Sequence, residues 1–235
     1  KKMFINGKWV DALSGETFSD YNPYNWEVYA HVAKGDARDA DKAMEAAYNA
    51  RKVWAGTPPI ERAKVLFKAA RVLEEMMMDV AMVLQEEGGG TFGKAMFEIS
   101  QTIDLIETAA GDCKKILGET FHTDPSKLSM TLWKPRGTVV AISPWNFPLI
   151  LSMYKVAYGL AAGNTIVLKP ASDTPVVGLK IAELFEKAGL PPGALNVITG
   201  PGSVIGDALI DDDRCSFVTI TGETGTGRQI GRAHV

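Results

Sequence analysis

The chain has 235 residues, of which 46% are hydrophobic and 23% are charged, and its formal net charge at pH 7 is −3. This balance is typical of a globular protein with a sizeable core, and the mixed charges, without a basic block, argue against nucleic acid as a partner. No stretch approaches the roughly 20 apolar residues of a membrane span, the N-terminus has no signal-peptide core, and two cysteines cannot form a disulfide framework. We therefore expect a cytoplasmic protein without a membrane anchor and without a metal site.

The N-terminal part of the chain predicts a β-meander. Residues 3–10, 17–21 and 27–31 are short β-prone runs separated by turn residues. One of these turns contains Asn6-Gly7, which is a strong hairpin signal.

The following part predicts three helices. Apolar residues recur at helical spacing from residue 36 to 54, from 61 to 86 and from 92 to 117. Three consecutive methionines in the second helix, Met76 to Met78, favour core packing over a soft-metal site, because no Cys or His lies nearby in the sequence. Cys113, in the third helix, is expected to be a structural thiol.

Residues 119–135 differ in character from the helices before them. They predict a β-hairpin with its turn at Asp124-Pro125-Ser126. A hairpin without a core of its own usually packs on something else.

The rest of the chain alternates between strands and helices. A β-branched run at residues 138–142, an apolar helix at 149–162 and a second run at 165–168 predict a βαβ unit and hence a parallel sheet. Further cycles follow up to residue 220 and predict a doubly wound α/β sheet. In such sheets ligands bind beyond the carboxyl ends of the strands.

Two glycine-rich loops follow strands in this region. The first, Gly200-x-Gly202-x-x-x-Gly206, has one residue more than the dinucleotide fingerprint, and a tight strand-to-helix turn is the alternative interpretation. The second is TGETGTG at residues 221–227, where helix N-terminal amides would suit a phosphate. Because it lacks the Gly-Lys-Ser/Thr of a P-loop, ATP is disfavoured. Two such loops on successive units favour a nucleotide site.

The motif PWNFP at residues 144–148, followed by KPAS at 169–172, resembles the aldehyde dehydrogenase superfamily. The resemblance runs from Met3 to about Arg228. It implies NAD(P)-dependent oxidation of an aldehyde to a carboxylic acid through a cysteine thiohemiacetal and a thioester. It also implies a Rossmann-like cofactor domain, with strands and helices in residues 1–117 and the dinucleotide-binding units in 136–229. Residues 118–135 would protrude and join a neighbouring subunit of a homodimer or homotetramer.

The resemblance assigns roles to individual residues near the PWNFP motif. Asn146 would donate its amide N–H to an oxyanion, although sequence alone favours a turn asparagine. Lys155 would lie near the site and relay protons. A substrate tunnel would be lined by Phe147, Leu151 and Tyr154, which share one helical face, but ordinary core packing is a serious alternative.

The cofactor site implied by the resemblance contains Ile142, Ser143, Pro144, Trp145, Lys169, Ser172, Gly202, Gly206, Thr221, Gly222 and Glu223. Lys169 would bind the adenosine ribose. Ser172 occupies the position where many NAD-preferring members carry a glutamate that repels a 2′-phosphate. We therefore expect use of NADP or of both cofactors, with Asp173 as the residue that could restore repulsion. Glu223 stands where many members have serine beside the pyrophosphate.

The family's nucleophilic cysteine and general-base glutamate lie C-terminal to the TGET loop. Neither Cys113 nor Cys215 matches the nucleophile, so we expect a fragment that lacks the catalytic domain and is inactive alone. Residues 230–235 match a reading frame of a common sequencing adapter and are expected to be a non-native tail. The alternatives are a non-catalytic nucleotide-binding fragment and an acylating aldehyde dehydrogenase relative. An aliphatic or aromatic aldehyde is slightly favoured over a charged semialdehyde.

Overall fold

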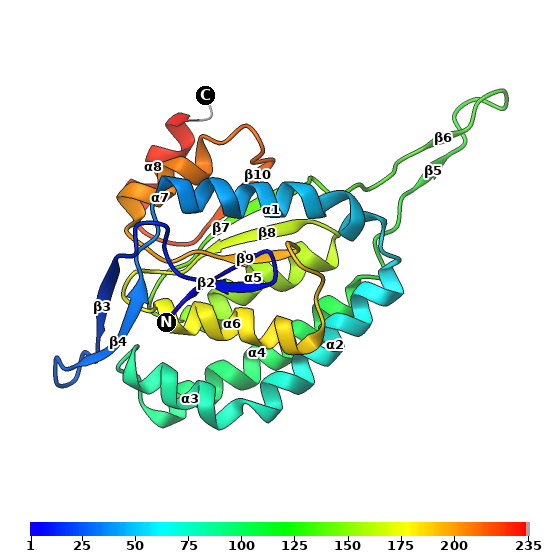
Figure 1. The fold of residues 1–235 in the computed structure, drawn as a ribbon. Helices are drawn as coiled ribbons and strands as arrows, with labels where there is room; N and C mark the ends of the chain where they lie inside the picture. Colours follow the sequence, from blue (N-terminus) through cyan, green and yellow to red (C-terminus); the bar gives the residue numbers. More distant parts are fainter. Residues whose placement is uncertain (234–235) are drawn as a thin grey trace.

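A six-stranded mixed sheet with helices on both faces forms the body of the protein in the computed structural model, which describes residues 1–233 (Figure 1). Two antiparallel strands lie at one edge of the sheet and four parallel strands make up the remainder. In spatial order the strands are β10 (Phe217–Ile220), β7 (Thr138–Ile142), β8 (Thr165–Lys169), β9 (Leu195–Val197), β1 (Met3–Ile5) and β2 (Lys8–Val10). The predicted α/β class is confirmed.

The central strands β7 and β8 are covered on both faces. All five residues of β8 and the first four of β7 are buried. Both are rich in β-branched residues, and such uninterrupted apolar runs are typical of parallel strands that lie between two helical layers.

The strand order contains one reversal. From β7 the chain adds β8 and then β9 on the same side, and it then returns to place β10 on the other side of β7. The reversal opens a crevice between β7 and β10 at their carboxyl ends, where doubly wound folds bind ligands. The helices that follow the four parallel strands are α5 (Pro148–Ala161), α6 (Pro175–Ala188), α7 (Gly202–Ile210) and α8 (Thr224–Ala233).

The two helical layers differ in composition. Helices α1 (Ala37–Gly56) and α7 pack together on one face of the sheet, whereas α5 and α6 lie on the other face (Figure 1). Behind α5 and α6 lie α2 (Pro59–Glu75) and α4 (Phe92–Asp112). The crevice is therefore bounded by the ends of helices from both layers.

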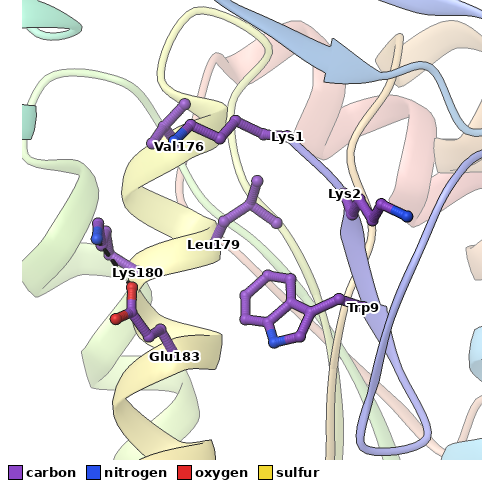
Figure 2. A pocket seen from close by; sticks show the side chains of 7 residues that line it. All are labelled: Lys1, Lys2, Trp9, Val176, Leu179, Lys180 and Glu183. Carbon is purple, nitrogen blue, oxygen red and sulfur yellow. Dashed lines mark hydrogen bonds and ion pairs between the residues drawn. The ribbon is translucent and has the colours of Figure 1, made fainter.

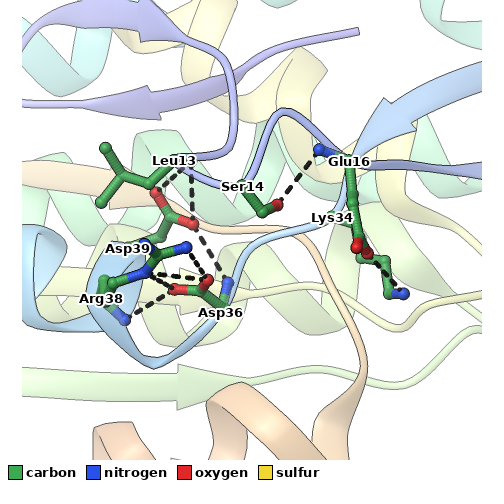
Figure 3. A network of polar contacts seen from close by, with 7 residues as sticks. All are labelled: Leu13, Ser14, Glu16, Lys34, Asp36, Arg38 and Asp39. Atoms are coloured by element: carbon green, nitrogen blue, oxygen red, sulfur yellow. Dashed lines mark hydrogen bonds and ion pairs between the residues drawn. The ribbon is translucent and has the colours of Figure 1, made fainter.

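The start of α1 is fixed by a network of carboxylates (Figure 3). Asp36 caps the helix and accepts the Arg38 amide at 2.8 Å, and Asp39 accepts the Asp36 amide at 3.1 Å. Asp39 also accepts the Leu13 amide at 3.2 Å. The same buried carboxylate thus completes a capping box and ties the loop after β2 to the helix.

Three local predictions were wrong. The N-terminal meander is instead two hairpins in different sheets, because β1 and β2 join the main sheet while β3 (Thr17–Tyr21) pairs only with β4 (Val28–Ala33). The helix expected at 61–86 is interrupted at Met76 and continues as α3 (Met77–Glu86), which packs against α4 and α6. The helix expected to reach residue 117 ends at Asp112.

The hairpin predicted at 119–135 is confirmed. Strands β5 (Thr120–Phe121) and β6 (Ser129–Met130) pair and extend far from the body (Figure 1). Its exposed apolar side chains include Leu128, Leu132 and Trp133. Across residues 1–233, no helix has the length and hydrophobicity needed to cross a membrane.

Candidate functional site

A cavity of about 870 Å³ lies at the carboxyl ends of the parallel strands. It coincides with the crevice at the reversal of strand order. Of the residues predicted from the sequence, it brings together Ile142, Ser143, Pro144, Trp145, Asn146, Leu151, Lys169, Gly202, Gly206, Thr221, Gly222 and Glu223.

Backbone hydrogen bonds hold the loops at the strand ends together. The Ser143 amide donates to the Lys169 carbonyl at 3.2 Å, and the Thr221 amide donates to the Ile142 carbonyl at 3.1 Å. These bonds continue the parallel ladders by one step beyond the strands. Three loops that are distant in sequence therefore form one continuous wall.

Lys169 is the cation of this wall. Its side chain is 5% exposed, and within residues 1–233 its ammonium donates only to the Pro170 carbonyl, at 3.2 Å. Burial lowers the pKa of Lys169 to about 8, against a smaller opposing effect of Asp173. An ammonium has three donors, so the remaining two are available to oxygen atoms of a ligand.

Glycines leave the floor of the cavity open. Gly202 begins α7, whose N-cap Pro201 has no side chain able to cap it, so backbone amides are free at that end. A Cβ at Gly202 would lie 3.7 Å from Lys169 Cε, and a Cβ at Gly206 would meet nothing within 4 Å. Uncapped amides beside a buried lysine suit the phosphates and ribose of a dinucleotide.

Gly200 has a different role from its neighbours. Its φ is +147°, and a Cβ there would lie 2.8 Å from the Gly35 carbonyl oxygen. The alternative interpretation of a turn glycine therefore applies to Gly200, because it permits two chain segments to cross closely.

Asn146 presents an unused amide at one end of the cavity. Its side chain is exposed, and it has no hydrogen-bond partner in the described part of the chain. It is held between Pro144 and Pro148, the latter being the first residue of α5. Proline restricts the backbone two residues away on each side, which holds the loop and leaves the amide free to bond to a ligand.

Lys155 lies behind the wall rather than in it. Its ammonium donates to the Leu151 carbonyl at 2.7 Å and to the Thr221 hydroxyl at 2.8 Å. Burial lowers the pKa of Lys155 to about 8. The lysine thereby connects α5 to the TGET loop, and the Thr221 hydroxyl stands between it and the cavity.

Some predicted residues lie outside this cavity. Ser172 donates to the Gly200 carbonyl at 3.2 Å and lines an adjoining hollow of about 330 Å³, together with Asp173 and Trp145. Of the three proposed tunnel residues only Leu151 lines the cavity. The Phe147 ring lies beneath the Lys94 ammonium, 4.5 Å from its centroid, and Tyr154 is half exposed.

Sequence reasoning missed part of the lining. The additional residues are Ser203, Asp207, Ile210, Ile220 and Thr226. Three of them could have been found, because Ser203, Asp207 and Ile210 share the helical face of α7 that begins with Gly202.

A second hollow, of about 270 Å³, lies between α6 and the β1–β2 hairpin (Figure 2). Four of its polar side chains, those of Lys2, Trp9, Lys180 and Glu183, already have partners. Lys180 pairs with Asp79 at 2.6 Å and with Glu183 at 2.8 Å, and the Trp9 indole donates to Glu186. It shares no lining residue with the larger cavity at the strand ends.

The two cysteines do not resemble activated nucleophiles. Cys113 is buried and Cys215 is half-buried, and burial raises the pKa of both thiols. A nucleophilic cysteine requires the opposite shift.

Comparison with known proteins gives a consistent result. The model of the aldehyde dehydrogenase family matches residues 9–235. D-glyceraldehyde dehydrogenase (NADP(+)) of Picrophilus torridus is 37% identical over 230 residues, which are 97% of this chain and 47% of that protein. Alpha-ketoglutaric semialdehyde dehydrogenase of Bacillus subtilis is 38% identical over 232 residues, 98% of this chain and 48% of that protein. The chain spans about half the length of these curated relatives.

Solved structures agree with the sequence relatives. The NAD+ complex of aldehyde dehydrogenase from Bacillus cereus has a TM-score of 0.97 at 39% identity and covers 99% of this chain and 48% of that one. A 3,6-anhydro-L-galactose dehydrogenase in complex with NAP has a TM-score of 0.95 at 37% identity, covering 99% and 49%. The family model, the relatives and the structures together show that this chain belongs to the aldehyde dehydrogenase family.

Proposed function

We propose that this chain supplies the cofactor site and one oxyanion-stabilising donor of an NAD(P)-dependent enzyme that oxidises an aldehyde to a carboxylic acid. One observation carries the proposal. A single cavity contains the unpaired Asn146 amide, the buried Lys169 ammonium and the uncapped start of α7.

Each group has a distinct task in this proposal. Lys169 binds ribose hydroxyls, the amides at the start of α7 bind phosphate oxygens, and Asn146 donates to the aldehyde oxygen as negative charge develops on it. The Lys155–Thr221 pair is placed to move a proton towards the cavity, since a lysine with a pKa of about 8 is partly neutral at the pH of most cells. When bound, the nicotinamide cofactor would accept the hydride.

The nucleophile is proposed to lie outside these 235 residues. The raised pKa of Cys113 and of Cys215 opposes thiolate formation at both positions. With no nucleophile of its own, this chain alone is expected not to oxidise aldehydes. Leu151, the one proposed tunnel residue that lines the cavity, supports an aliphatic or aromatic aldehyde as substrate.

NADP, or both cofactors, is the proposed redox partner. Ser172 carries a hydroxyl rather than a carboxylate, and it lines the hollow of about 330 Å³ that adjoins the cavity. The absence of a carboxylate from this side chain removes one source of repulsion for a 2′-phosphate. The named relatives include an NADP(+) enzyme, and the similar structures include complexes with NAP and with NAD+.

The proposed organisation follows the resemblance. Residues 1–117 and 136–229 form the cofactor-binding unit, and residues 118–135 contact a second subunit in a homodimer or homotetramer. The exposed apolar residues of the hairpin support this contact.

Two measurements test the proposal. Isothermal titration of the 235-residue chain with NADP and with NAD should give saturable binding that is lost in Lys169→Met. The complete protein that contains this chain should reduce NADP or NAD when given benzaldehyde or a short aliphatic aldehyde. The proposal would be refuted if neither the 235-residue chain nor the complete protein bound NADP or NAD. It would also be refuted if Lys169→Met left the cofactor affinity unchanged.

A further inference from the structure

Glu98 is a buried carboxylate in the middle of α4. It is 0% exposed, and it occupies the face of the helix that packs against α5. Burial raises its pKa, in opposition to the amides that it accepts. A buried carboxylate destabilises a fold unless its partners compensate for the loss of water, so Glu98 requires hydrogen-bond donors from the surrounding residues.

The partners of Glu98 are the first amides of α5. Its Oε1 accepts the Leu149 amide at 2.8 Å and the Ile150 amide at 3.1 Å. The N-cap of α5, Phe147, has no side chain able to cap the helix. Glu98 therefore replaces the missing cap, and its charge is favourably placed at the positive end of the helix dipole.

A helix cap that comes from another helix also fixes the two helices relative to each other, which a local cap does not. A serine or aspartate at position 147 would satisfy the same amides without fixing α5 relative to its surroundings. Glu98 ties the first turn of α5 to α4 across the helix interface. Its Oε2 accepts no hydrogen bond from residues 1–233 and lies 3.9 Å from the Lys94 ammonium, which also covers the Phe147 ring. Lys94 and Glu98 thus hold both sides of the turn that precedes α5.

Asn146 is the residue whose position depends on this turn. It lies three residues before Leu149, and the link contains Pro148, whose backbone is restricted. Because the Asn146 side chain has no hydrogen-bond partner among the described residues, its backbone is the one part of the residue that the fold holds, and that backbone sets where the amide can reach.

We propose that Glu98 is a positioning residue for the oxyanion donor: by anchoring the Leu149 and Ile150 amides it holds the turn from which the Asn146 side chain projects. This inference rests on the proposed function. It concerns a residue that does not line the cavity.

A double-mutant cycle in the complete protein tests the inference. The four proteins are the parent, Glu98→Leu, Asn146→Ala and the double variant, assayed for NAD(P)H formation from benzaldehyde. Asn146→Ala should lower kcat by about 100-fold or more. In the parent, Glu98→Leu should lower kcat by about tenfold with the cofactor Kd unchanged. In the Asn146→Ala background, Glu98→Leu should lower kcat by less than about twofold.

Controls separate positioning from general damage. Thr102→Val removes a buried hydroxyl one turn further along α4. Within residues 1–233 that hydroxyl donates only to the Glu98 carbonyl of its own helix, so this variant should leave kcat unchanged. Glu98→Gln keeps an acceptor of the same reach and should retain kcat within about threefold. If Glu98→Leu does not fold, Glu98→Asp, which is too short to reach both amides, takes its place in the cycle.

The outcomes are distinguishable. Three results would overturn the positioning role. They are a loss that is equal with and without Asn146, an unchanged kcat in Glu98→Leu (or in Glu98→Asp where that takes its place), and the same loss in Thr102→Val. If Asn146→Ala itself leaves kcat unchanged, the proposed oxyanion donor fails, whatever the Glu98 variants do.

Discussion

Lys169 shows how one residue prepares a site for a ligand. Its ammonium is nearly fully buried, with a single weak carbonyl partner among the described residues. The cost of that burial is visible as a pKa of about 8, compared with 10.5 for a free lysine. A ligand that supplies oxygen atoms would give the ammonium new hydrogen-bond partners. Because the free protein already bears the desolvation penalty of Lys169, ligand binding does not add it again.

Cofactor binding should therefore be accompanied by proton uptake. A ligand oxygen favours the charged lysine and raises its pKa, so protons are taken up above about pH 8, where the lysine of the free protein is partly neutral. Calorimetry of NADP binding in two buffers with different ionisation enthalpies measures this uptake. Proton uptake that is absent at pH 8.5, or equal in Lys169→Met, would contradict the prediction.

The same lysine affects stability in the free protein. A lowered pKa means that the unfolded chain binds more protons between about pH 8 and 10.5. Over that window the free energy of unfolding should rise with pH, since the destabilising charge is lost first from the folded state. Urea denaturation of the parent at pH 8 and pH 9.5 should show a larger rise than the same experiment on Lys169→Met.

Ser172 makes the cofactor preference testable with one substitution. Ser172→Glu would bring a carboxylate next to the loop that follows β8, where it would repel a 2′-phosphate. NADP should bind at least about tenfold more weakly, while NAD is affected by less than about threefold. Ser126→Glu, in the turn of the distant hairpin, is the control and should change neither Kd.

At the scale of elements, two helical glycines provide a matched test of packing. A Cβ at Gly178 in α6 would lie 2.6 Å from Pro170 Cγ, whereas a Cβ at Gly111 in α4 would meet nothing within 4 Å. Gly178→Ala should lower the free energy of unfolding by about 1–3 kcal/mol through overpacking. Gly111→Ala should raise it by up to about 1 kcal/mol, because alanine is the better helix former.

Urea denaturation of both variants measures whether the higher helix propensity of alanine or the contact with Pro170 has the larger effect on the free energy of unfolding. Because Pro170 follows Lys169 directly, Gly178→Ala should also weaken NADP binding, and Gly111→Ala should not. Stabilisation by Gly178→Ala would show that α6 can move away from the loop and that the contact is not restrictive.

The elements were predictable from sequence where the signal was local. The Asn6-Gly7 turn and the β-branched runs of β7 and β8 each lie within a few residues, and the structure contains the expected strands. The pairing of β1 with β9 joins segments from opposite ends of the chain, so no local pattern could reveal that the N-terminal strands belong to two sheets. The helix break at Met76 could not be predicted, because no Pro or Gly lies at that point of the sequence.

The candidate site was predictable to a similar degree and for the same reason. Motif residues at strand ends could be predicted to lie together because each loop has a local signature, and the structure gathers them around one cavity. Glu98 was not found, since its role depends on how α4 packs against α5. The sequence does show Glu98 three residues after Ala95 and four before Thr102, on one helical face, but only the structure shows that this face is buried.

At the scale of the whole molecule, the β5–β6 hairpin extends away from the body and exposes apolar side chains that the body does not cover (Figure 1). Leu128 is 77% exposed and Trp133 is 74% exposed. Leu128→Glu with Leu132→Glu should reduce self-association of the complete protein without altering its thermal unfolding by more than about 2 °C, because these side chains contribute little to the core. Sedimentation velocity measures the association.

A change in NADP affinity in that variant would show that the hairpin influences the site. An unchanged sedimentation coefficient would show that the hairpin does not hold subunits together. Lys127→Glu at the same turn adds a comparable charge change without removing apolar surface and serves as the control.

The position of β10 has a consequence for synthesis on the ribosome. Strands β7, β8 and β9 emerge in spatial order, but the neighbour of β7 on its other side is made last. At translation rates of about 5–20 residues per second, the hydrogen-bonding edge of β7 stays open for several seconds. An open apolar strand edge invites pairing with another nascent chain. Codon choice between β9 and β10 should therefore influence the yield of folded protein, since slow translation there prolongs the exposure.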